Sequence, residues 1–188
     1  MMAQFLPPKI FSILPINRHD LWVSDLVHVY LSGPIIHSDL RKDDFYQAVV
    51  KHLESRGISV FAPQFLGPAE PDEIYRRDVE HVRKCDVLVA EVSNPSLGVG
   101  MEIMLAREIE TPVLLFRNTN SFPLSKMVVG MDRKVLFEYS SIDEVIDILT
   151  GLNFDRIGYY RTCPECNSDI VEYIDAQTNR CVNCGIEF

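Results

Sequence analysis

The sequence lacks the features of a membrane protein and of a nucleic-acid-binding protein. No apolar run approaches the roughly 20 residues that a membrane-spanning helix requires. Lysine and arginine number 18 against 27 aspartates and glutamates, which gives a net charge of -9 and a pI near 5.0. This balance disfavours a broad basic surface, so we expect neither nucleic acid nor a membrane as a partner. A small anionic ligand is still compatible, because backbone amides at a helix start can hold a phosphate.

The start of the chain lacks the basic segment and the unbroken apolar stretch of a signal peptide. It is apolar, but Pro7, Pro8 and Pro15 interrupt it. We therefore expect a cytoplasmic protein in which residues 1–26 form an irregular N-terminal extension on the domain surface.

Apolar runs rich in β-branched residues alternate with amphipathic stretches through the middle of the chain. The runs cover residues 27–32, 58–62, 87–92, 112–116 and 134–137, and the amphipathic stretches cover 43–56, 71–84, 100–110 and 142–149. This alternation predicts an α/β fold over residues 27–152. Strands that are apolar throughout, such as VLVAEV, suit a sheet covered on both faces. We predict a doubly wound, mostly parallel five-stranded sheet of the Rossmann or flavodoxin-like type, with ligands at the carboxyl ends of the strands.

Four of the five cysteines lie within residues 159–188, in two CxxC pairs. The first pair is Cys163 and Cys166 and the second is Cys181 and Cys184, and fourteen residues lie between the two pairs. Four thiolates at this spacing predict a zinc ribbon with a structural Zn²⁺, since a closed four-sulfur site leaves no position for substrate. A pair of disulfides is the competing chemistry in an oxidising compartment or a hyperthermophile. Cys85, which precedes an apolar run, is expected to be a core residue, and no organic cofactor is indicated.

A glycine-containing turn, AEVSNPSLGVGMEI, leads from the third predicted strand into the next helix. Gly98 and Gly100 would let the backbone approach a ligand, and Ser96 offers a hydroxyl beside the helix start. Glu102 falls in the first turn of the predicted helix, where the helix dipole should keep its carboxylate ionised, as a nucleophile must be. A glutamate at such a position is more commonly a capping residue, so the pattern alone does not decide.

Five segments together resemble the nucleoside 2-deoxyribosyltransferase superfamily and, within it, the 2'-deoxynucleoside 5'-phosphate N-hydrolases. They are YLSGP from Tyr30, RDVE from Arg77, CDVLVAEV from Cys85, PSLGVGME from Pro95 and SKM from Ser125. The resemblance implies a double displacement in which Glu102 attacks the anomeric carbon, Asp78 assists departure of the base and Tyr30 lies at the sugar site. It also implies substrate contacts from Ser32, Gly33, Ser96, Gly98, Gly100, Ser125 and Met127, with Ser125 supplied by the neighbouring subunit of a homodimer with shared active sites.

The segments that carry the resemblance differ in the substrate that they indicate. Ser96 favours a nucleoside 5'-monophosphate, because the nucleoside transferases have an acidic residue there that would repel a phosphate. Pro34 and Ile36 instead resemble the transferase loop, since the hydrolases carry a serine and an arginine at these positions; His37, Ser38 and Arg41 are the residues that could compensate. We expect hydrolysis of a (2'-deoxy)nucleoside 5'-monophosphate, with base exchange between nucleosides and a noncatalytic nucleotide-sensing module as alternatives.

Overall fold

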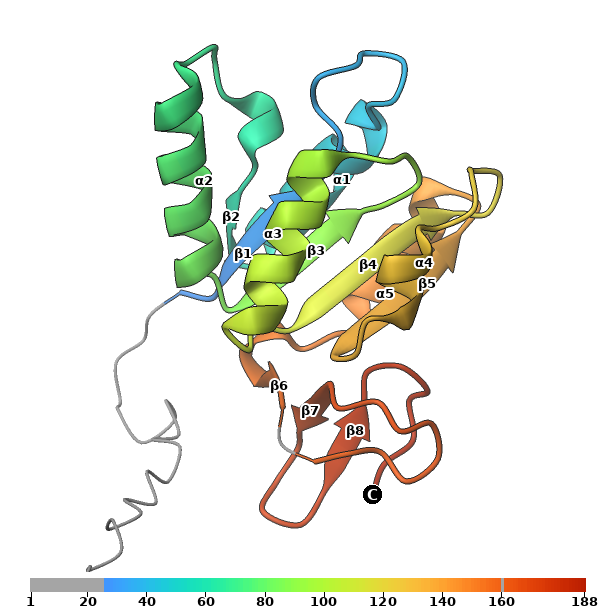
Figure 1. The fold of residues 1–188 in the computed structure, drawn as a ribbon. Coiled ribbons are helices and arrows are strands. Elements are labelled where there is room, and N and C mark those ends of the chain that lie inside the picture. Colours follow the sequence, from blue (N-terminus) through green and yellow to red (C-terminus); the bar gives the residue numbers. More distant parts are fainter. Residues whose placement is uncertain (1–25, 160) are drawn as a thin grey trace, which may run out of the picture.

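A five-stranded parallel sheet forms the centre of the protein (Figure 1). The computed structural model describes residues 26–159 and 161–188, so residues 1–25 of the expected N-terminal extension lie outside the described residues. The strand order is β2-β1-β3-β4-β5, which is the flavodoxin-like order. The prediction of an α/β fold with a parallel five-stranded sheet is confirmed. The strands are β1 (His28–Ser32), β2 (Ser59–Phe61), β3 (Val87–Glu91), β4 (Val113–Asn118) and β5 (Lys134–Tyr139).

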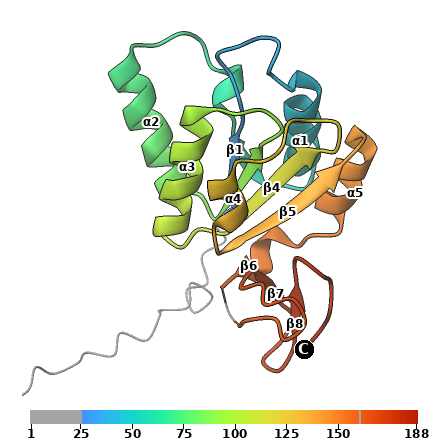
Figure 2. The same ribbon diagram turned by 45° about the vertical axis from the view of Figure 1, so that its right-hand side comes forward.

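Helices cover both faces of this sheet (Figures 1 and 2). α1 (Asp43–Ser55) and α5 (Ile142–Thr150) pack together on one face. α2 (Pro71–Lys84), α3 (Leu97–Glu108) and the short α4 (Lys126–Gly130) cover the other, and a 3-10 turn, η2 (Pro63–Phe65), follows β2. Among the described residues, no helix combines the length and the apolar character needed to span a bilayer.

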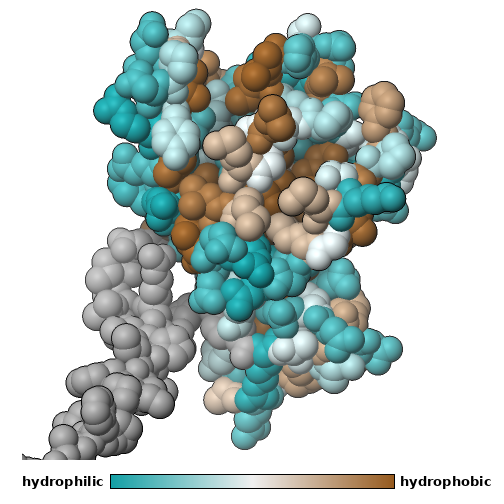
Figure 3. Space-filling model, viewed as in Figure 1, coloured by the Kyte–Doolittle hydropathy of each residue, from teal (hydrophilic) through white to brown (hydrophobic). Residues whose placement is uncertain are grey.

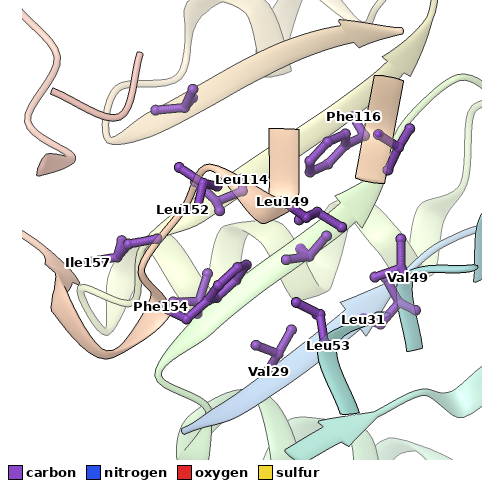
Figure 4. Packing of buried hydrophobic residues seen from close by; sticks show 14 of the residues in the cluster. Val29, Leu31, Val49, Leu53, Leu114, Phe116, Leu149, Leu152, Phe154 and Ile157 are labelled. Carbon is purple, nitrogen blue, oxygen red and sulfur yellow. The ribbon is translucent and has the colours of Figure 1, made fainter. Parts of the chain in front are cut away.

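Each face of the sheet has its own apolar cluster. Because side chains alternate along a strand, Val29 and Leu31 pack beneath α1 and α5, whereas Tyr30 between them joins the cluster beneath α2 and α3. Figure 4 shows Leu31 near Val49 of α1 in the first of these clusters. The alternation matters for function, since it directs every second side chain of β1 toward α3.

Two helices, α3 and α4, differ from the sequence prediction by more than the shifts of one or two residues seen at other boundaries. α3 begins at Leu97, three residues before the predicted start, because the Ser96 hydroxyl caps it by accepting a hydrogen bond from the Val99 amide at 3.5 Å. Gly98 lies inside the first turn without breaking the helix. The short helix α4 was not predicted; its five residues are too few to show a helical periodicity.

The C-terminal residues form a second, antiparallel sheet of three short strands, β6 (Ile157–Gly158), β7 (Val171–Tyr173) and β8 (Asn179–Cys181), after the 3-10 turn η3 (Phe154–Arg156). It packs at the amino-terminal rim of the parallel sheet, below it in Figures 1 and 2. The Tyr159 hydroxyl donates to the carbonyl oxygens of Thr111 and Arg133 at 3.1 and 3.2 Å, just before β4 and β5. Ile170 and Val182 join the apolar cluster of α1 and α5, so the two parts share one core.

Candidate functional site

The strand order reverses between β1 and β3, since β2 lies on one side of β1 whereas β4 and β5 follow β3 on the other side. A crevice is expected at such a point. The two strands are neighbours, with Ser32 opposite Ala90 at their carboxyl ends. α1 leaves β1 toward one face of the sheet, and α3 leaves β3 toward the other. The chain segments above these two strands therefore diverge. Tyr30 and Ser32 of β1 point to the same face, which is the face that α3 covers.

The Glu102 carboxylate of α3 meets these two hydroxyl groups. The Tyr30 hydroxyl donates to Glu102 Oε1 at 2.8 Å, and the Ser32 hydroxyl donates to Oε2. Tyr30 and Ser32 are buried, at 0% and 1% exposure. Both carboxylate oxygens of Glu102 thus accept hydrogen bonds from neutral hydroxyl groups at the carboxyl end of β1.

The predicted environment of Glu102 requires a correction. Because α3 begins at Leu97, Glu102 lies in its second turn and not in its first. The helix dipole loses its effect beyond the first turn. Burial instead raises the pKa of the Glu102 carboxyl group, the hydroxyl groups of Ser32 and Tyr30 lower it, and the negative charge of Asp78 raises it. The prediction that the dipole stabilises the ionised form is therefore wrong.

Asp78 approaches the same site from α2. Its negative charge contributes, after burial and Glu102, to a pKa of Tyr30 well above the usual range, so Tyr30 remains a hydrogen-bond donor. The Asp78 carboxylate accepts a hydrogen bond from Arg77 Nε at 2.8 Å, and its side chain is 14% exposed. Arg77 was not among the predicted site residues. The signal available in the sequence was the position of Arg77 directly before Asp78, the candidate acid.

The predicted ligand-contacting residues of the β3–α3 connection lie at the same rim. Ser96 caps α3, and Gly98 and Gly100 are exposed in its first turn. A side chain at Gly100 would meet nothing within 4 Å, and one at Gly98 would lie 3.9 Å from the Ser96 hydroxyl. Gly33 differs, because a Cβ there would lie 2.3 Å from the hydroxyl oxygen of Tyr46. The fold itself therefore requires glycine at 33 but not at 98 or 100.

Ser125 and Met127 stand apart from the Glu102 cluster within this chain. Both are exposed, Met127 at 85%, and the Ser125 hydroxyl makes no hydrogen bond to the part of the chain that the structure describes. Of the residues expected to compensate for Pro34 and Ile36, Arg41 is already engaged. Its guanidinium pairs with Asp43 at 2.7 Å and donates to the Gln64 carbonyl oxygen at 3.3 Å.

The four cysteines of the second sheet converge as predicted. Their sulfur atoms all lie within 4.8 Å of one another. The Cys163–Cys184 and Cys166–Cys181 sulfur distances are 3.7 and 3.5 Å, close to the ~3.8 Å edge of a tetrahedron with metal–sulfur bonds of about 2.3 Å. A disulfide bond is far shorter, about 2.05 Å, and all five cysteines are free thiols. The cluster fits a metal ion such as zinc. Cys85 is buried, as expected.

Comparison with known proteins agrees with this geometry. The model of the family described as nucleoside 2-deoxyribosyltransferase matches residues 29–151. The chain belongs to this family. The match includes the parallel sheet and the cluster of Tyr30, Asp78 and Glu102, and it ends before the four cysteines of this family member.

Several relatives in the family carry the names of nucleotide N-hydrolases. A putative 2'-deoxynucleoside 5'-phosphate N-hydrolase 1 of Syntrophotalea carbinolica is 42% identical over 77 residues, which are 40% of this chain and 54% of the relative, so the match spans about half of that protein. The protein of the same name in Thermofilum pendens is 34% identical over 138 residues, covering 66% of this chain and 93% of the relative. The 5-hydroxymethyl-dUMP N-hydrolase of Danio rerio is 36% identical over 115 residues, covering 55% and 80%.

A solved structure supports the fold alone. The CMP N-glycosidase of Clostridium botulinum superposes with a TM-score of 0.51 at 18% identity, covering 65% of this chain and 98% of that chain.

Proposed function

We propose that the protein hydrolyses the N-glycosidic bond of 2'-deoxynucleoside 5'-monophosphates, with Glu102 as the nucleophile. The observation that carries this proposal is the Glu102 carboxylate, held through both oxygens by Tyr30 and Ser32 where β1 and β3 diverge. The names of the relatives in Syntrophotalea carbinolica and Thermofilum pendens support the substrate class.

The proposed reaction consists of two displacements at the anomeric carbon. A Glu102 oxygen bonds to this carbon as the bond to the base breaks, and the electron pair of that bond leaves with the base. Asp78, which takes up a proton when the substrate binds, gives that proton to the departing base. Water then attacks the same carbon, passes a proton to Asp78 and releases the sugar phosphate, which returns Glu102 to its carboxylate form. Tyr30 and Ser32 keep the carboxylate directed at the crevice throughout.

We assign the 5'-phosphate to the start of α3. Glycine within a helix costs up to about 1 kcal/mol relative to alanine, and neither Gly98 nor Gly100 has a positive φ or a close neighbour that excludes a side chain. These glycines weaken the helix without serving the packing, which supports close approach of a ligand to the backbone. Free amides at the helix start and the Ser96 hydroxyl suit a phosphate group.

We further propose a homodimer in which Ser125 and Met127 reach the partner's site. Leu97, Met101 and Met104 project from one side of α3 at exposures of 91%, 60% and 52%, and Met127 of α4, a helix on the same face of the sheet, is 85% exposed. Figure 3 shows apolar side chains over α3 and α4 on this face. A contiguous exposed apolar surface of this kind is typical of a protein–protein interface.

The metal that we propose for the four thiolates is a structural zinc ion in a ribbon of residues 159–188. Zinc accepts four thiolates in a closed tetrahedron, with no open position for substrate. The cluster lies at the amino-terminal rim of the parallel sheet, opposite Glu102, so the ion supplies stability and takes no part in the displacement.

Release of free base tests the proposed function. The protein is incubated with a panel of deoxynucleosides and their 5'-monophosphates, and we expect base and sugar phosphate from the monophosphates. Glu102→Gln should lower kcat/KM at least about a thousandfold, as removal of a nucleophile commonly does. Glu108→Gln on the same helix, whose side chain is 54% exposed, is the matched control and should retain activity. Turnover by Glu102→Gln, or no base from any nucleotide, would refute the proposal.

A specific feature keeps deoxyribosyl transfer as the second candidate. Pro34 and Ile36 supply no cation, and Arg41 is committed to Asp43 and Gln64, so the β1–α1 loop lacks a free guanidinium for a phosphate. A transferase releases base only when an acceptor base is present and accepts nucleosides without phosphate. Adding an acceptor base to the same panel separates the two activities. A noncatalytic nucleotide-binding module would release no base, and its Glu102→Gln variant would bind nucleotide as tightly as the wild type.

A further inference from the structure

A second buried carboxylate, Glu91, lies near the site but outside the Glu102 cluster. It is the last residue of β3 and has 0% exposure. Its side chain points to the α1 and α5 face, as do Val89 and Val87 two and four residues before it. An ionisable residue inside an otherwise apolar strand is costly to bury. An aliphatic residue would fill this position more cheaply if packing were its only task.

All the hydrogen bonds that Glu91 makes in the described part of the chain are donated by neutral groups. The Ser93 amide donates to Oε1 and Oε2 at 3.2 and 3.3 Å, the Ser93 hydroxyl donates to Oε1, and the Tyr139 hydroxyl donates to Oε1 at 3.1 Å. Within residues 26–159 and 161–188, no lysine or arginine forms an ion pair with it. The carboxylate is therefore held by the segment that immediately follows it and by β5.

These bonds fix the connection that leads into α3. The Ser93 hydroxyl accepts a hydrogen bond from the Asn118 amide at the end of β4, at 2.8 Å. The next residue, Asn94, donates from Nδ2 to the Leu40 carbonyl oxygen at 3.0 Å. The start of α3 is thereby joined to the carboxyl ends of β3, β4 and β5 and to the β1–α1 loop.

The Glu91 carboxylate also lies near Tyr46, whose side chain contacts the β1–α1 loop. Its negative charge, after burial, raises the pKa of Tyr46. The Tyr46 ring occupies the space beside Gly33, and its hydroxyl donates to the Pro34 carbonyl oxygen at 3.2 Å. Both loops around the crevice, residues 33–42 and 92–96, thus depend on groups that contact Glu91 or lie beside it.

We propose that Glu91 is a positioning residue that holds the β3–α3 connection, and with it Ser96 and Glu102, in the geometry that catalysis requires. This inference rests on the proposed N-glycosidase function. A glutamine at position 91 would keep the shape and, through its Oε1, the bonds from the Ser93 and Tyr139 hydroxyl groups. Its amide NH₂ would replace Oε2 and face the Ser93 amide, which now donates to that oxygen. The connection would shift to relieve the donor–donor contact, and α3 would move with it.

The test compares Glu91→Gln with Glu172→Gln. Glu172 is also a buried carboxylate, at 1% exposure. It accepts hydrogen bonds from the Asn153 amide and Arg180 at the opposite rim. At a temperature well below both melting points, kcat of Glu91→Gln should fall at least tenfold, while kcat of Glu172→Gln stays within twofold of wild type. A kcat for Glu91→Gln within twofold of wild type, or an equal loss in Glu172→Gln, would overturn the inference.

Hydrogen exchange supplies a readout that needs no turnover, so failure of the proposed function and failure of this inference remain distinguishable. In Glu91→Gln the amides of residues 33–42 and 92–97 should exchange faster, and those of 171–181 should not change. Unchanged or uniformly faster exchange would count against a positioning role. If Glu91→Gln does not fold, Tyr139→Phe removes one donor and keeps the ring stacked on Phe45 at 5.6 Å; the same segments should respond, more weakly.

Discussion

Glu102 experiences opposing effects on its pKa, and they identify the residues that tune it. Burial acts first and raises the pKa, and the charge of Asp78 acts in the same direction. The two hydroxyl groups of Ser32 and Tyr30 act against them by donating to the ionised form. In the proposed mechanism only the carboxylate form attacks carbon, so we expect the balance between burial and these two donors to set the pH range of activity.

Replacing Tyr30 with phenylalanine should change the pH profile in a defined direction. If Glu102 is the nucleophile, as proposed, only its ionised form is active, so kcat/KM should be at its plateau above the Glu102 pKa and should fall as the pH drops through it. Loss of the Tyr30 donor removes an effect that lowers this pKa. We therefore expect the acid limb of kcat/KM to move to higher pH.

Tyr159→Phe is the matched control for this measurement. Its hydroxyl donates to backbone carbonyls at the amino-terminal rim, remote from Glu102. The control should leave the acid limb in place. An unmoved acid limb in Tyr30→Phe would mean that a group other than Glu102 limits activity at low pH.

At the scale of elements, the start of α3 combines weak helix propensity with the proposed binding surface. Gly100→Ala should therefore stabilise the protein while weakening substrate binding. Alanine fits because nothing lies within 4 Å of the new Cβ, and the gain is up to about 1 kcal/mol in the free energy of unfolding. The added methyl group would occupy the space assigned to the substrate, and we expect KM to rise at least about tenfold. Thermal unfolding and steady-state kinetics measure the two effects.

Gly57→Ala provides the contrast. Gly57 has a φ of 77°, so alanine there is strained and should lower stability. Its turn precedes β2 at the rim away from Glu102, and KM should remain that of wild type. A KM for Gly100→Ala equal to wild type would place the substrate away from this part of α3.

The elements themselves were largely predictable, because strands buried on both faces and amphipathic helices leave clear apolar periodicities. The start of α3 was not, since Gly98 and Gly100 suggest a loop and only the Ser96 cap reveals the helix. The pattern placed Glu102 near the crevice, but its hydrogen bonds to Tyr30 and Ser32 depend on contacts across about 70 residues. Glu91 was missed although a lone charge in VLVAEV was visible, since sequence alone does not show whether such a charge is buried.

At the scale of the whole molecule, the two chemical centres lie at opposite rims of one sheet. Glu102 lies at the carboxyl rim, and the four thiolates lie in the antiparallel sheet packed against the amino-terminal rim. The second sheet contributes Ile170 and Val182 to the cluster that also contains Leu149 and Phe154. Stability is therefore shared between the two parts, whereas the chemistry is not.

Metal removal should separate these two properties. Stripping the ion with a chelator should disorder residues 163–184 and expose Ile170 and Val182. Two aliphatic side chains contribute about 3 kcal/mol, which for a chain of this size corresponds to a fall in Tm of roughly 6–12 °C. Well below that Tm, kcat of the metal-free protein should stay close to wild type. Metal analysis, thermal unfolding and base release give the comparison; loss of activity in proportion to metal loss at low temperature would contradict it.

The parallel arrangement also has a consequence for how the chain can grow. With all five strands pointing the same way, every loop that shapes the crevice emerges from one end of the sheet. The other end of the sheet carries none of these loops, so a module that follows in the chain can pack there without contacting the proposed catalytic residues. The thiolate-bearing sheet packs at that end, so its outer surface can change in sequence without altering the loops that carry the proposed catalytic residues.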